Sequence, residues 1–111
     1  MAKFYLEKLT QLVSDLDIED ELAVALEIKH FFSGAALYAD KVICASWSPA
    51  GIAFKLSESE VAELIASGIA KPLKYFAKGH VKKGYALFEH PELEKKSMLK
   101  SLILNAVEHR G

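Results

Sequence analysis

The residues best suited to bind another molecule lie in a lysine-rich segment, residues 71–83. Lysine side chains neutralise phosphate groups and aromatic rings stack on nucleic-acid bases, so the two interleaved predict a surface for nucleic acid or another acidic partner. A second interpretation stays open, because lysines also guard the edge strands of sheets against pairing with other sheets. The candidate surface consists of Lys71, Lys74, Lys78, Lys82, Lys83 and Tyr75.

Negative charge gathers in residues 15–21, where five of the seven residues are aspartate or glutamate. This acidic segment has two interpretations. It could be the opposite pole of a contact with a second copy or with another protein, or it could be a solvated turn. The sequence leaves both open.

No motif indicates covalent chemistry. Cys44 lies between Ile43 and Ala45 in a hydrophobic strand pattern, so we expect a buried thiol with a raised pKa in place of a nucleophile. The four histidines lack the paired spacing of a metal site, and glycine-rich phosphate loops are absent. We therefore predict a non-enzymatic protein with no catalytic residues, no cofactor and no metal site.

Length and composition predict one soluble domain over residues 1–111. The chain is 51% hydrophobic and 26% charged with a formal net charge of -1, so any nucleic-acid binding must come from a local patch. The single cysteine favours a reducing compartment, and charged residues interrupt the N-terminal apolar positions of a signal peptide or membrane span. We expect a cytoplasmic protein that does not contact membranes.

The first half of the chain predicts a helix followed by a four-stranded meander. Leu9, Leu12, Val13 and Leu16 share one helical face, which predicts a helix over residues 3–16. Residues 18–24 are ambiguous and could hold a short helical turn. Alternation from residue 25 predicts a strand through residue 32, and strands 35–39, 42–47 and 52–56 follow, separated by turn residues. Apolar residues on both faces of 42–47 predict a central strand.

The second half predicts a helix, two strands and a last helix. Ser57 followed by Glu60 is a capping-box signature, and Gly68 fits the left-handed position after the helix end. Short strands are expected over residues 73–77 and 84–88, joined near 78–83. Pro91 is expected at the first position of the last helix, whose core stripe includes Leu99. The fold class is α+β, in the order α-β(4)-α-β(2)-α.

Residues 31–47, FFSGAALYADKVICASW, followed by GIAFKL at 51–56, resemble the N-terminal domain of the TfoX/Sxy family. The family pattern is Met-Phe-Gly-Gly, an aromatic-aliphatic strand, Asp-Gly-Lys and a strand ending in Leu-Lys. This chain has Phe31 for Met, Ser33 for the first Gly and Lys41 for the Gly of Asp-Gly. Residues 71–75, KPLKY, are similar to the family's later Pro-Phe-x-Tyr element.

The resemblance implies a strongly curved antiparallel sheet with packed helices. It also implies a bacterial regulatory role, because TfoX proteins regulate natural competence together with the cyclic-AMP receptor protein. Many members of the family carry a second, C-terminal domain, which we expect this chain to lack, so a link to the regulation of competence or transcription stays open. The motif positions are Phe32, Gly34, Tyr38, Asp40 and Lys55, and we assign them a structural role, with a binding role as the alternative.

The resulting hypothesis is a small regulatory or protein-interaction module that acts through a surface. A protein partner is expected, and self-association stays open. The alternative is a nucleic-acid-binding accessory protein that uses the lysine-rich segment.

Overall fold

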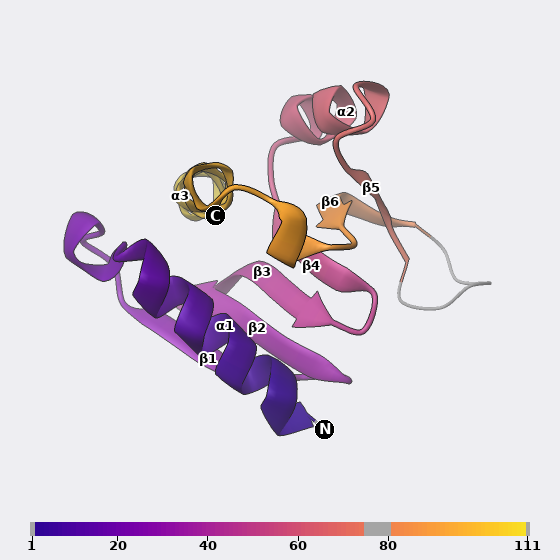
Figure 1. Cartoon of the computed structure of the whole chain (residues 1–111). Helices are drawn as coiled ribbons and strands as arrows, with labels where there is room; N and C mark the ends of the chain where they lie inside the picture. The colour runs from indigo at the N-terminus through magenta and orange to yellow at the C-terminus, as the bar shows by residue number, and fades with distance from the viewer. Residues whose placement is uncertain (1, 75–80, 111) are drawn as a thin grey trace.

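The computed structural model describes residues 2–74 and 81–110. Within these ranges the chain forms an antiparallel sheet in the order β1-β2-β3-β4-β6-β5, with helices packed on it (Figure 1). The elements along the chain are α1 (Ala2–Leu16), η1 (Glu19–Glu21), β1 (Leu26–Phe31), β2 (Gly34–Ala39), β3 (Val42–Ser48), β4 (Gly51–Lys55), α2 (Glu58–Ala66), β5 (Lys71–Leu73), β6 (Lys82–Phe88), η2 (Pro91–Leu93) and α3 (Lys96–His109). The α+β prediction and the element order are confirmed.

The main core lies between the sheet and the helices α1 and α3, which share one face of the sheet. The predicted stripe of α1 is buried there, as is Leu99 of α3. The rings of Phe54 and Phe88 meet edge to face in this core with 5.8 Å between centroids. A smaller cluster forms on the opposite face around Ala53, Leu73, Tyr85 and Leu87. The strand β3 is buried over most of its length, as expected for a central strand.

Two-residue turns connect the first four strands. In the β2–β3 turn, Asp40 and Lys41 have φ angles of +49° and +70°. A two-residue turn with positive φ at both positions matches the twist of the flanking strands, and glycine adopts the second of these angles most easily. The left-handed backbone at Lys41 therefore gives the physical reason for the Gly in the family's Asp-Gly pattern.

The helix α2 has the ends that the sequence predicts. Ser57 Oγ accepts a hydrogen bond from the Glu60 backbone N–H at 3.2 Å, and Gly68 has a φ of +79°. The other half of the capping box is replaced, because Glu60 Oε2 accepts a hydrogen bond from the Asn105 amide at 2.9 Å. This bond ties α2 to α3.

Several element boundaries differ from the prediction. The strands β5 and β6 each begin two residues earlier than expected, at Lys71 and Lys82, and β5 ends at Leu73. Residues 75–77 of the predicted strand lie outside the described residues. Pro91 opens the short 3-10 turn η2, and α3 begins at Lys96, so the prediction of Pro91 as the first residue of the last helix was wrong. Between η2 and α3, Glu94 has extended backbone angles, and η2 ends before this residue.

Candidate interaction surface

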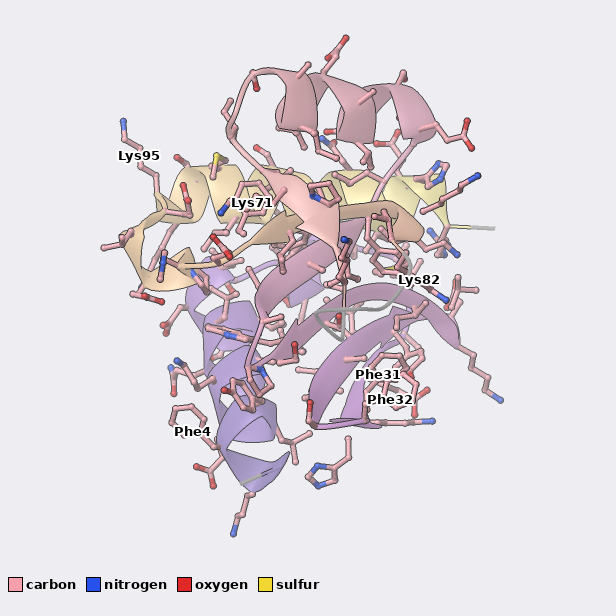
Figure 2. The ribbon with its side chains drawn as sticks, turned by 90° about the vertical axis from the view of Figure 1, so that its right-hand side faces the viewer. Phe4, Phe31, Phe32, Lys71, Lys82 and Lys95 are labelled. Atoms are coloured by element: carbon pink, nitrogen blue, oxygen red, sulfur yellow. The ribbon has the colours of Figure 1, made fainter. Side chains whose placement is uncertain are left out.

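The tip of the β1–β2 hairpin presents an aromatic side chain to solvent. Phe32 is the first residue of the two-residue turn and leaves 79% of its surface exposed. Its ring meets that of Phe31 with 4.5 Å between centroids, and Figure 2 shows the two side by side. The backbone φ of Phe32 is +52°, a region that costs a bulky L residue about 1–2 kcal/mol and that glycine occupies freely. The strand predicted through residue 32 therefore ends at Phe31, and the turn holds an aromatic ring where the backbone favours glycine.

Gly34 fixes the distance between β2 and β3. A Cβ atom at this position would lie 1.9 Å from the carbonyl oxygen of Trp47 and 2.9 Å from the Cα of Ser48. Both of these are backbone atoms, which have little freedom to move in the middle of a sheet. The hairpin below Phe32 is thus held tightly against the central strand.

Asp40 joins three separate parts of the chain. Its Oδ1 accepts a hydrogen bond from the Ala25 N–H at 3.2 Å, and its Oδ2 lies 3.0 Å from Nη2 of Arg110. The backbone N–H of Asp40 also donates to the Ala25 carbonyl at 2.9 Å. The start of β1, the β2–β3 turn and the end of α3 are therefore linked by one carboxylate. Sequence reasoning did not identify Arg110, because nothing local relates it to a turn so distant in the chain.

The two remaining motif residues are half-buried in the sheet. Tyr38 lies opposite Glu27 of β1, and the ammonium group of Lys29 is 5.6 Å from its ring centroid. Lys55 lies opposite Tyr85 of β6. Both positions support strand pairing, and their motif roles stay predictions.

The described lysines of the candidate surface lie on β5, directly after it and on β6. Lys71 Nζ forms an ion pair with Glu89 Oε1 at 2.7 Å, and this hydrogen bond lowers the pKa of the Glu89 carboxyl. Figure 2 shows Lys71 and Lys82 apart from each other. Lys82 lies opposite Leu73, where the pairing of β5 with β6 is irregular, and Lys83 follows it along β6; both side chains are exposed. Lys78 and Tyr75 lie outside the described residues.

The acidic segment makes contacts within the chain. Asp15 Oδ2 lies 3.4 Å from Lys96 Nζ, and Glu21 Oε2 lies 2.5 Å from Lys100 Nζ. A hydrogen bond from the Gln11 amide is the main cause that lowers the pKa of Asp15. Part of the segment therefore holds the end of α1 and the turn η1 against α3.

Cys44 is a core residue at an irregularity of the sheet. Leu37 pairs with Ala45 and Tyr38 pairs with Ile43, which leaves Cys44 as the extra residue of a bulge. The side chain is fully buried, and burial raises the pKa of its thiol. The expectation of a buried thiol with a raised pKa is confirmed.

Two kinds of site are absent from the part of the chain that the structure describes. Residues 2–74 and 81–110 contain no group of three or more histidine, cysteine or acidic side chains placed to hold a metal ion. No helix in these ranges is long and apolar enough to cross a membrane.

These features define the class of the protein: an α+β domain with an open antiparallel sheet and an exposed aromatic hairpin tip. Comparison with family models identifies the family. The model of the TfoX N-terminal domain matches residues 21–110 of the 111-residue chain, and the chain belongs to this family. The helix α1 lies outside the matched segment. No curated protein matches the chain.

Proposed function

We propose that this protein is a small, non-enzymatic regulatory module that binds another protein through the tip of the β1–β2 hairpin. The observation that carries the proposal is Phe32, a residue that is 79% exposed and has a positive φ angle. Strained backbone and a large exposed apolar side chain each oppose stability, so their coincidence favours a role in binding.

The surroundings of Phe32 suit an anchor residue. Aromatic side chains dominate the energetics of protein interfaces, because they bury much area and lose few rotamers on binding. The contact with Phe31 and the close approach of Gly34 to Trp47 hold the tip in place before a partner arrives. Such preorganisation lowers the entropy lost on association.

Membership of the TfoX N-terminal domain family supports a regulatory role for the interaction. The finer proposal is that the partner belongs to the machinery that regulates competence or transcription. The protein would then modulate that machinery by occupying a surface on it.

Photo-crosslinking in the cells that produce the protein tests this proposal. A photoreactive phenylalanine analogue is placed at position 32 in one variant and at Phe4 in a control, since Phe4 is also an exposed aromatic, at 54%, but lies on α1. We expect position 32 to give a discrete protein adduct that position 4 does not give. With the partner identified and purified, Phe32→Ala should weaken binding about tenfold or more. Equal adducts from both positions, or unchanged affinity of the alanine variant, would contradict the proposal.

The second candidate function is nucleic-acid binding through three exposed lysines: Lys74, which follows β5, and Lys82 and Lys83 on β6. Lys74, Lys82 and Lys83 form no ion pair within residues 2–74 and 81–110, unlike Lys71. Unpaired ammonium groups are free to replace the counterions of a phosphate backbone.

Fluorescence anisotropy of labelled duplex and single-stranded DNA tests the second candidate at about 50 and 200 mM salt. The test variant changes Lys74, Lys82 and Lys83 to glutamine. A matched control changes Lys3, Lys41 and Lys95, which are exposed and lie elsewhere. Nucleic-acid binding predicts an affinity that falls with salt and falls about tenfold in the test variant only. Absence of binding at micromolar protein, or an equal loss in both variants, would rule it out.

A further inference from the structure

The two edges of the sheet differ in how well they are protected. The edge strand β5 has three residues and contains Pro72, and both features discourage pairing with another strand. The other edge strand, β1, has six residues without proline and pairs with β2 residue for residue, with no bulge. An edge of this length and regularity is a template for a further strand.

The hydrogen bonds of β1 show which of its backbone groups face outward. At the end of the β1–β2 ladder, the Asp40 N–H donates to the Ala25 carbonyl, and the Ala25 N–H donates to Oδ1 of Asp40. Antiparallel ladders alternate between hydrogen-bonded and non-bonded pairs. The backbone groups of Leu26, Ile28 and His30 therefore point away from β2. Within the described residues no loop or side chain bonds to them.

We propose that β1 pairs antiparallel with β1 of a second copy of this chain, about a two-fold axis at Ile28. In this register Ile28 lies opposite Ile28 of the second copy. Leu26 of each copy lies opposite His30 of the other, which gives two further pairs. These three hydrogen-bonded pairs supply roughly six main-chain hydrogen bonds. The two sheets join into one continuous sheet, and the interface is isologous, as in most homodimers.

Charge selects both the partner and the register. With the axis at Ile28, Glu27 lies opposite Lys29 of the second copy, and Lys29 lies opposite its Glu27. Within one chain, the exposed side chains of Glu27 and Lys29 form an ion pair, with 3.6 Å between Oε2 and Nζ. Moving the axis by one residue in either direction would place Lys29 opposite Lys29 or Glu27 opposite Glu27, and like charges in facing positions destabilise a sheet. The sequence of β1 is therefore complementary to itself in one register.

Among residues 2–74 and 81–110, no helix or strand other than β2 pairs with β1 or covers its outer edge. The helix α1 covers the face of the sheet, mainly over β2, and β1 lies at the margin (Figure 1). Glu27, Lys29 and His30 are exposed, and Ile28 is half-buried, so pairing covers apolar surface that the single chain leaves in water. The Phe32 tips lie beyond the last paired residue, one at each end of the interface.

Sedimentation equilibrium of the purified protein, with charge reversal and rescue, tests the proposal. We expect a dimer at micromolar protein. Glu27→Lys and Lys29→Glu should each weaken it about tenfold, since each places two like-charged pairs at the axis. The double variant should recover the dimer, and an equimolar mixture of the two single variants should form heterodimers. Glu63→Lys on α2 makes the same charge change far from β1 and should leave the dimer unchanged.

A second variant distinguishes loss of the dimer from loss of the fold. His30→Pro removes an outward N–H and spares the bonds to β2, so it should abolish the dimer while circular dichroism shows a folded chain. A monomer at all concentrations, or a dimer that resists Glu27→Lys or is not recovered in the double variant, would overturn the proposal. The measurement uses the protein alone, so its outcome is independent of whether Phe32 binds another protein.

Discussion

Substitution of Gly34 with alanine is expected to lower the free energy of unfolding by about 3 kcal/mol. The added Cβ would lie 1.9 Å from the Trp47 carbonyl oxygen, inside any normal contact distance. The two strands would have to separate, and the pairing of Ala35 with Trp47 would weaken. Urea unfolding followed by the fluorescence of Trp47, the single tryptophan, measures the change.

Gly84→Ala is the matched control for this substitution. Gly84 has a φ of +86° with no atom within 4 Å of the Cβ position, so alanine there incurs the cost of the left-handed backbone alone, about 1 kcal/mol. Gly34 does not have a positive φ, so the stability that alanine costs at position 34 comes from steric overlap. A smaller loss of stability in the Gly34 variant than in the Gly84 variant would show that β2 and β3 tolerate a wider spacing.

The thiol of Cys44 is expected to react with a disulfide reagent about a thousandfold more slowly in the folded protein than in urea. Its side chain is fully buried, so reaction requires an opening that costs several kcal/mol. Absorbance of the released thiolate follows the reaction at a pH near neutrality. Rapid stoichiometric labelling without denaturant would contradict the burial of Cys44.

Burial also sets the sign of a pH effect at Cys44. It raises the pKa of the thiol above its ordinary value of 9.0, so the folded chain keeps the proton that the unfolded chain releases. The contribution of this group to stability is fully present below pH 9.0 and is lost as the pH rises above it.

The predictions that succeeded rest on local chemistry. Ser57 and Gly68 predicted both ends of α2, because a cap and a left-handed glycine act within one turn of a helix. The turn at Asp40 was predicted because hairpin turns depend on the residues inside them. The meander of four strands followed from turn residues at regular intervals.

Other features depend on contacts between distant residues. The position of β6 between β4 and β5 has no local signal, because the residue pattern of β6 does not indicate which strands it pairs with. Arg110 reaches Asp40 only after the whole domain has assembled. Whether the lysines of residues 71–83 share one face depends on the β5–β6 register, and the irregular pairing between Pro72 and Leu73 has no local signal because it depends on packing.

The strand pairings of the sheet also differ in the length of chain that lies between the two paired strands. Strands β1 to β4 pair only with their sequence neighbours across two-residue turns, so these contacts cost little loop entropy. The pairing of β4 with β6 closes a loop that includes all of α2 and β5. Within the sheet, contact order is therefore low among the first four strands and higher where β6 pairs with β4. The pairing that places Ile52 opposite Phe88 and Phe54 opposite Ala86 closes the longest loop of any strand pairing.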